Sequence, residues 1–298
     1  MTILRTVFYT LLALSSNCDK FDPTKVNYCE KFCPDKTKST GCECQAQGTR
    51  TEVDLQNVFE FRKLCLDEHN YWRNYLASGS ERRKKATSAS DMMALSYSLE
   101  LEFLARCYGR STFNGYHEDC RMMSNNRQAG QNLAGLNRKN FSLSLVKVQI
   151  WDWYNEIENL APDMFGKFRR GHKIEHFATM VWGQVNQVGC ARIYTADTKK
   201  DNFKHPVYVQ ALICDYGSTI LGKMGTKVAP NWLGRPIYTK GKPCSKCPDN
   251  LKCNRVYTAL CGEIEPVPQE PPYQFNTARR WKIYSVLLYF GLLTNQQT

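Results

Sequence analysis

The fold of this chain is decided by the stretch HFATMVWGQVNQVGC, residues 176–190. It opens on a histidine, closes on a cysteine and roughly alternates polar and apolar residues, a pattern that predicts a half-buried strand over residues 179–194. A second strand is expected over residues 206–216. Four of its apolar residues share one side: Val207, Val209, Ala211 and Ile213. Adjacent and antiparallel, the two strands would bring Cys190 and Cys214 within disulfide reach.

Three helices are expected before these strands, because apolar residues recur at three- and four-residue steps. The first covers residues 51–77 and closes at Gly79. Its apolar stripe contains Val58, Phe61, Cys65, His69, Trp72 and Leu76. We interpret His69 as a buried histidine that its neighbours satisfy, rather than as a ligand.

The second helix would run from Ser90, a residue type that caps helices, to about Tyr108. Its inward residues would be Met93, Tyr97, Leu101 and Leu104. The third helix would cover residues 143–159. The residues near one of its faces are Leu145, Val148, Trp151 (or Asp152) and Asn155.

The composition of the 298-residue chain is that of a folded globular protein, with 42% hydrophobic, 23% charged and 12% aromatic residues. The formal net charge of +12 favours contact with acidic surfaces such as anionic lipids or sulfated glycans. The basic residues are scattered, however, and no groove of interleaved aromatic residues is visible. We therefore expect no nucleic-acid partner.

Both ends of the chain carry short apolar segments. Residues 1–16 are typical of a secretory signal peptide, which predicts an extracellular protein. Residues 266–298 begin as a Pro-rich linker and contain the short apolar run 283–293. A membrane span needs about 20 apolar residues, so this tail predicts at most peripheral membrane contact. A lipid-anchor attachment signal is the alternative.

The chain contains fourteen cysteines, and behind a signal peptide such a dense, even set predicts disulfides. Zinc is the alternative at Cys42-x-Cys44 and Cys244-x-x-Cys247, but secretion disfavours it and no histidine lies near either cluster. Asn140 begins the sequon Asn-Phe-Ser and is a candidate glycosylation site.

Six motifs in order along residues 50–217 together resemble one family. They are HNYWRNYLASG (69–79), YHEDC (116–120), GQNLA (130–134), WYNEI (153–157), HFATMVWGQVNQVGC (176–190) and LICDYG (212–217). The chain is similar to the CAP superfamily of cysteine-rich secretory, antigen 5 and pathogenesis-related 1 proteins. The N-terminal cysteines most resemble the arthropod antigen 5 (venom allergen 5-like) branch.

The resemblance implies an α+β fold, a three-layer α-β-α sandwich around a central antiparallel sheet. The order of the predicted elements, with the helices first, the strands late and no βαβ alternation, agrees with this fold. We divide the chain into a signal peptide, a stapled N-terminal extension, a CAP domain, a Cys-rich C-terminal extension, and a Pro-rich linker with a short apolar tail. The boundaries are 1–16, 17–50, 51–217, 218–265 and 266–298.

The resemblance also implies a cavity of two histidines and two acidic residues, which falls on His117, Gln131, Glu156 and His176. Gln131 stands at the second acidic position and brings no charge. His117 and His176 are the candidate metal ligands, and a weakly held divalent ion such as zinc is expected. The alternative is a purely structural His176–Glu156 hydrogen bond, and no cofactor is required.

The disulfides implied by the resemblance are Cys29–Cys42, Cys33–Cys120 and Cys190–Cys214. The fourth family bridge would join Cys44 to a cysteine near residue 112. The available thiol here is Cys107, so either the local backbone differs or Cys44 has another partner. Cys18 and Cys65 are additional and could pair together. The last four cysteines predict a small stapled knob.

We therefore expect a secreted, non-enzymatic antigen 5-like protein that binds a lipid or sterol, or an extracellular protein partner. A secreted protease or other hydrolase that uses His117 and Glu156 is one alternative, but no Ser or Cys nucleophile lies in an elbow motif. A toxin-like effector of venom or saliva is the other.

Overall fold

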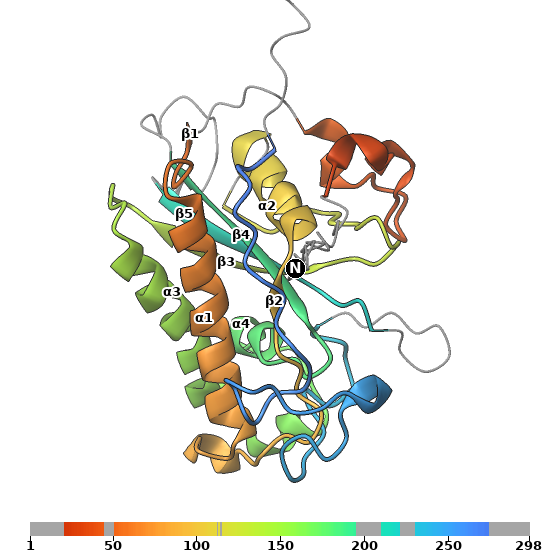
Figure 1. Cartoon of the computed structure of the whole chain (residues 1–298), viewed down its shortest axis with the longest axis vertical. Helices are drawn as coiled ribbons and strands as arrows, with labels where there is room; N and C mark the ends of the chain where they lie inside the picture. The colour runs from red at the N-terminus through yellow and green to blue at the C-terminus, as the bar shows by residue number, and fades with distance from the viewer. Residues whose placement is uncertain are drawn as a thin grey trace, which may run out of the picture.

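The computed structural model describes residues 21–44, 51–111, 113, 115–194, 210–220 and 230–273 (Figure 1). At its centre is an antiparallel sheet in the order β1-β4-β5-β3. These strands are β1 (Thr51–Glu52), β4 (Gln187–Tyr194), β5 (Gln210–Gly217) and β3 (Gly130–Leu136). A short strand, β2 (Ser96–Tyr97), pairs with β4 in parallel.

Helices cover both faces of this sheet. One face packs against α1 (Val58–Ala77), α3 (Leu143–Asn155) and α4 (Glu175–Met180), and the other against α2 (Leu99–Ser111) (Figure 1). The three-layer α-β-α sandwich is therefore confirmed.

Both faces of the two central strands are buried, with side chains alternating between two cores. Val188, Cys190, Leu212, Cys214 and Tyr216 join the core shared with α1, α3 and α4. Ala191, Ile193, Ala211 and Ile213 join the core beneath α2. Ala211 and Ile213 thus share a side, as expected, whereas Val207 and Val209 lie outside the described residues.

The first predicted helix is confirmed in type, but α1 begins at Val58 rather than at residue 51. Thr51 and Glu52 pair with β4 instead. Asp54 then turns the chain with a φ of 66° and forms an ion pair of 2.6 Å with Arg192. Because residues 51–52 pair with a strand of the sheet, the helix cannot begin where the apolar periodicity predicts it. At the other end Gly79, with a φ of 80°, follows the helix as predicted.

The second helix starts later than predicted, because α2 begins at Leu99 and not after Ser90. The preceding residues are extended and bond to distant backbone. Met93 N donates to Gly183 O and Ala94 N donates to Cys261 O, both at 2.8 Å. Ser90 caps nothing, since its N–H and hydroxyl both donate to Thr239 O.

The third predicted helix exists, and the face that holds Val148 and Trp151 is not its buried face. Val148 and Trp151 are 52% and 42% exposed. The residues buried on α3 are Val146, Gln149, Ile150, Trp153 and Tyr154. Both faces of this helix carry apolar residues, so periodicity alone does not identify the buried one. Polar atoms fix the true face, because Gln149 Nε2 and Trp153 Nε1 donate to backbone carbonyls of β3.

Two further elements differ from the sequence prediction. Residues 175–180 form α4, so the strand expected from residue 179 begins only at Gln187. The third helix ends at Asn155, and residues 156–159 continue as a 3-10 turn. β3 was not predicted as a strand, although it contains the quoted GQNLA motif.

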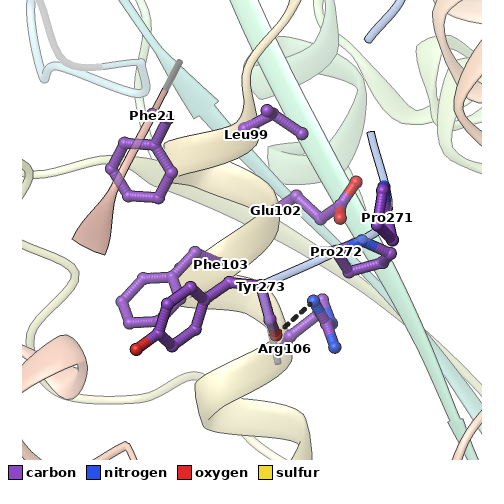
Figure 2. A pocket seen from close by; sticks show the side chains of 8 residues that line it. All are labelled: Phe21, Leu99, Glu102, Phe103, Arg106, Pro271, Pro272 and Tyr273. Carbon is purple, nitrogen blue, oxygen red and sulfur yellow. Dashed lines mark hydrogen bonds between the residues drawn. The ribbon is translucent and has the colours of Figure 1, made fainter. Parts of the chain in front are cut away.

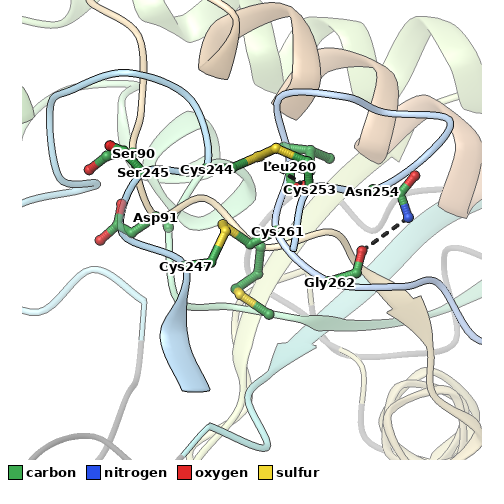
Figure 3. The surroundings of a disulfide bond; sticks show 12 residues. Ser90, Asp91, Cys244, Ser245, Cys247, Cys253, Asn254, Leu260, Cys261 and Gly262 are labelled. Atoms are coloured by element: carbon green, nitrogen blue, oxygen red, sulfur yellow. Dashed lines mark hydrogen bonds between the residues drawn. A yellow bond between two sulfur atoms is a disulfide. The ribbon is translucent and has the colours of Figure 1, made fainter. Parts of the chain in front are cut away.

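Six disulfides join described residues: Cys29–Cys42, Cys33–Cys120, Cys44–Cys107, Cys190–Cys214, Cys244–Cys253 and Cys247–Cys261. The last two staple the C-terminal knob, where Asn254 Nδ2 also donates to Gly262 O (Figure 3). Because the cysteines of both clusters are oxidised, they are not thiolate zinc ligands. Cys65 is a free, buried cysteine, so it does not form the pairing with Cys18 that the sequence left open. Cys18 itself lies outside the described residues.

After the knob, residues 263–273 form a segment that we call the strap, which passes between α1 and α2 (Figure 1). Arg62 of α1 holds it, because its Nη1 donates to the carbonyls of Pro268 and Glu270 at 2.8 and 2.6 Å. The same guanidinium forms a buried two-bond ion pair with Glu102 of α2. The strap is thus tied to both helical layers.

Within the described part of the chain, no helix has the length and apolar character needed to cross a bilayer. The predicted signal peptide and the apolar run 283–293 both lie outside that part.

Candidate functional site

Glu156 anchors one half of the candidate site. Its Oε2 accepts hydrogen bonds from the backbone N–H groups of His176 and Phe177 at 3.1 and 3.3 Å, which caps the start of α4. Its Oε1 lies 2.7 Å from Nδ1 of His176. One carboxylate therefore starts the helix and also fixes the orientation of the imidazole on it.

Gln131 on β3 holds the other half. Its Nε2 donates to the carboxyl groups of Glu118 and Asp215 at 2.7 and 2.9 Å, so its Oε1 must face the opposite way. That oxygen lies 3.0 Å from Nδ1 of His117. An amide oxygen only accepts, so Nδ1 of His117 carries the hydrogen and Nε2 keeps its lone pair.

The two imidazoles lie close together. Their ring centroids are 6.5 Å apart and the ring planes are tilted by 49°. The four residues expected at the cavity, His117, Gln131, Glu156 and His176, are thus brought together from a loop, β3, the end of α3 and α4. Burial lowers the pKa of His117, which favours its neutral form.

Sequence reasoning missed two carboxyl groups behind Gln131. Desolvation raises the pKa of Glu118, and the nearby charge of Asp215 adds to the rise. Burial likewise raises the pKa of Asp215, whose Oδ2 has no hydrogen-bond partner among the described residues. A signal was available, since Glu118 adjoins His117 and Asp215 pairs in register with Gln131 once β3 and β5 are aligned.

The donor set suits a transition-metal ion bound by nitrogen. Gln131 and Glu156 engage both Nδ1 atoms, so each imidazole of His117 and His176 keeps Nε2 available among the described residues. In metal sites a ligating histidine usually uses its second nitrogen in this way, on a carboxylate or carbonyl oxygen. Zinc takes imidazole nitrogen at about 2.0–2.1 Å. His117 and His176 would be the ligands, with Glu156 and Gln131 orienting them.

The described residues place no nucleophilic side chain in hydrogen-bond contact with the two imidazoles. Neither His117 nor His176 forms a side-chain hydrogen bond with a serine, threonine or cysteine of the described residues. A hydrolase that works through a covalent intermediate needs its nucleophile within hydrogen-bond reach of a base. Among the described residues, neither imidazole is therefore paired with such a nucleophile.

His69 is not part of this site. It is fully buried on α1, its Nδ1 lies 2.6 Å from Cys65 O, and its Nε2 lies 2.7 Å from the hydroxyl of Tyr216. Desolvation lowers the pKa of His69 to about 4. Both nitrogens are occupied, as expected for a buried histidine that its neighbours satisfy.

Comparison with known proteins identifies the class. The profile of the CAP family, described as the cysteine-rich secretory protein family, matches residues 66–216. The chain belongs to this family. Its division into extensions and a central domain stays a prediction.

Within the family, the chain is similar to arthropod venom proteins of the antigen 5 type. It is 30% identical to a cysteine-rich venom protein of Tityus serrulatus, with 89% of this chain and 58% of that protein covered. It is also 30% identical to venom allergen 5 of Polistes dominula, with 61% of this chain and 73% of that protein covered. The match spans little more than half the length of the scorpion relatives, 58% and 52%.

Two solved structures share the fold. The crystal structure of Na-ASP-1 aligns with a TM-score of 0.53 at 24% identity and covers 68% of this chain and 47% of that one. The crystal structure of NaASP2 with Zn²⁺ aligns with a TM-score of 0.52 at 23% identity and covers 68% and 95%. They support the sandwich topology described above.

Proposed function

We propose that this protein is a secreted, non-catalytic binding protein whose His117–His176 pair takes a divalent cation weakly. The observation behind the proposal is the matched pair of imidazoles, each with Nδ1 engaged and Nε2 available. Gln131 contributes no negative charge, and the raised pKa values of Glu118 and Asp215 favour their neutral forms. Affinity should therefore fall below that of a site with two ionised carboxylates.

The comparisons are consistent with this proposal without testing it. NaASP2 was solved with Zn²⁺, and the arthropod relatives are named as venom proteins, which are released from cells. The disulfides of this chain also suit an oxidising, extracellular compartment.

The test is calorimetric titration with zinc of the wild type, His117→Ala and His176→Ala. We expect each substitution to weaken binding by at least about tenfold, because one of two ligands is removed. His172 is an exposed histidine outside the site, so His172→Ala is the matched control and should bind as the wild type does. No heat from the wild type at millimolar zinc would remove the metal from the proposal.

The non-enzymatic part of the proposal needs its own test. Wild type and His176→Ala are compared on a panel of casein, peptide and ester substrates. We expect no turnover by either, because no nucleophile is paired with an imidazole in the described site. Turnover by the wild type that His176→Ala abolishes would favour the hydrolase alternative instead.

A cavity of about 240 Å³ supports an apolar ligand as a second candidate function (Figure 2). It lies between α2 and the strap. Its lining residues are Phe21, Leu99, Glu102, Phe103, Arg106, Pro271, Pro272 and Tyr273. Sites for drug-sized ligands usually measure about 300–1,000 Å³. The cavity therefore favours a short acyl chain or a single aromatic group over a whole sterol.

One polar atom beside this cavity favours a ligand with an acidic head. Arg106 is 5% exposed, its Nε bonds to Glu52, and its Nη1 donates to Tyr273 O at 3.3 Å (Figure 2). Its Nη2 is buried without a hydrogen-bond partner among the described residues. A carboxylate oxygen of a ligand would accept a hydrogen bond from this N–H group.

Decanoic acid is the probe for this site. We expect Phe103→Ala to weaken its binding by at least about tenfold, since Phe103 lines the cavity and packs against the rings of Phe21 and Tyr273. Phe141 is an exposed phenylalanine away from the cavity, so Phe141→Ala is the control. Equal binding by both variants would place the lipid elsewhere, and no binding at all would favour a protein partner.

A further inference from the structure

A free cysteine lies directly against a disulfide in the core. Cys65 of α1 and the bonded Cys190 and Cys214 of β4 and β5 have sulfur atoms within 4.8 Å of one another. All three residues are at most 1% exposed. This cluster is separate from the two histidines and from the cavity at the strap.

The fold explains why three sulfurs meet here. Cys190 and Cys214 are direct partners in the antiparallel ladder, with Cα atoms 4.1 Å apart, so both side chains project from the same face of the sheet. That face packs on α1, and Cys65 lies on the buried stripe of that helix. Helix α1 thus places the sulfur of Cys65 beside the Cys190–Cys214 disulfide.

We propose that these three cysteines form an exchange cluster, in which Cys65 can replace either partner of the Cys190–Cys214 disulfide. In the forward step the Cys65 thiolate attacks Sγ of Cys190, a Cys65–Cys190 bond forms, the Cys190–Cys214 bond breaks, and Cys214 leaves as the thiolate. Attack on Cys214 releases Cys190 in the same way. The proton of Cys65 passes to the leaving sulfur, and no external oxidant or reductant is consumed.

The products differ in what they tie together. The native bond joins two strands that the ladder already holds, whereas either exchanged bond would join α1 to the sheet. The helical layer would then be covalently fixed to β4 or to β5. The three cysteines can therefore form any one of three disulfides, and in each case the remaining cysteine is a free thiol.

The surroundings make the exchange slow in the folded state. Desolvation raises the pKa of the Cys65 thiol, so little thiolate is present at neutral pH. The charged groups that act on it are Asp54, Arg192, Glu102 and Glu68. His69, Tyr97 and Tyr216 are the uncharged titratable groups packed nearby. Since attack requires thiolate, the rate should rise about tenfold per pH unit below the pKa of the thiol.

The test is disulfide mapping of the full chain after incubation at pH 7, 8 and 9 without added thiol. Samples are quenched in acid, digested with pepsin at low pH and analysed by mass spectrometry. We expect peptides that join Cys65 to Cys190 or Cys214 to accumulate about tenfold faster per pH unit, at a rate independent of protein concentration. Cys18→Ser should behave as the wild type does, because Cys18 takes no part.

Two results would overturn the proposal. One is Cys190–Cys214 as the sole linkage of these residues at every pH, with Cys65 recovered as a free thiol. The other is loss of the mixed linkages in Cys18→Ser, or their dependence on concentration, which would assign the exchange to another thiol. Cys65→Ala should keep the native disulfide intact at pH 9, which controls for base-catalysed cleavage.

Discussion

Arg73 is the buried side chain whose replacement should reveal most about this fold. It lies on α1, is fully buried, and no carboxylate is bonded to it among the described residues. Its guanidinium donates to five backbone carbonyls instead, those of Met93, Met180, Trp182, Gly183 and Val185. It thus ties α1 to the extended segment before α2, to the end of α4 and to the loop after α4. Burial lowers the pKa of Arg73 to about 9, which still leaves it charged at neutral pH.

We predict that Arg73→Lys destabilises the protein by about 2–6 kcal/mol. A lysine ammonium has three donors, so at least two of the five carbonyls lose their partner. Each buried, unsatisfied carbonyl costs about 1–3 kcal/mol. Because domains are stable by only about 5–15 kcal/mol, the loss is a large part of the total. Arginine and lysine both carry one positive charge in water, so the substitution chiefly changes the number and arrangement of hydrogen-bond donors.

The assay is equilibrium unfolding in guanidinium chloride, followed by tryptophan fluorescence and circular dichroism, with disulfides intact. Arg170 is an exposed arginine with no hydrogen bond or ion pair among the described residues, so Arg170→Lys is the matched control and should stay within about 0.5 kcal/mol of the wild type. If Arg73→Lys also stays within 0.5 kcal/mol, the argument that the five carbonyls depend on a fork of donors is wrong.

Three further predictions concern the acidic pair, one disulfide and one glycine. Burial raises the pKa of Glu118 and Asp215, so the folded state holds protons that the unfolded chain releases above about pH 4. The contribution of this pair to the free energy of unfolding is therefore greatest at low pH and falls as the pH rises towards 8. Denaturant unfolding at pH 5 and 8 should show a smaller fall in that free energy for Glu118→Gln than for the wild type. An equal fall in both proteins would contradict this. Replacing Cys33 and Cys120 by serine removes a disulfide of sequence separation 87. Because Cys44–Cys107 already closes most of that loop in the unfolded chain, the chain-entropy estimate gives a cost of about 3–4 kcal/mol, measured by the same unfolding; a loss below 1 kcal/mol would count against it. In Gly189→Ala the new methyl would lie 2.2 Å from a backbone nitrogen of α2, so we expect a loss of at least about 3 kcal/mol, and a melting temperature equal to that of the wild type would show that α2 can move aside.

The sequence predicted the layers better than the element boundaries. Periodicity identified α1 because its stripe, including Phe61, Cys65 and Leu76, packs on a single neighbouring surface. It failed for α3, because Val148 and Trp151 are apolar yet face solvent. Residue spacing cannot tell which of two apolar faces is buried when hydrogen bonds to β3 decide the matter.

The candidate site was predictable only as far as its motifs extend. His117 and His176 come from separate motifs, and their meeting depends on the family resemblance. Glu118 and Asp215 required knowledge of strand register, which places Asp215 opposite Gln131. The free thiol of Cys65 was equally hidden, since an even number of cysteines suggested complete pairing and only the packing of α1 shows where this sulfur lies.

Arg62 binds the strap through main-chain carbonyls, so the amino-acid sequence of the strap can vary without loss of this attachment. Every residue type offers a carbonyl oxygen, so the side chains at Pro268 and Glu270 are not what the guanidinium recognises. Substitutions along the strap could alter the wall of the neighbouring cavity while leaving its attachment intact. Arg62 could thus hold straps of many different sequences, and each sequence could give a cavity wall that suits a different small molecule.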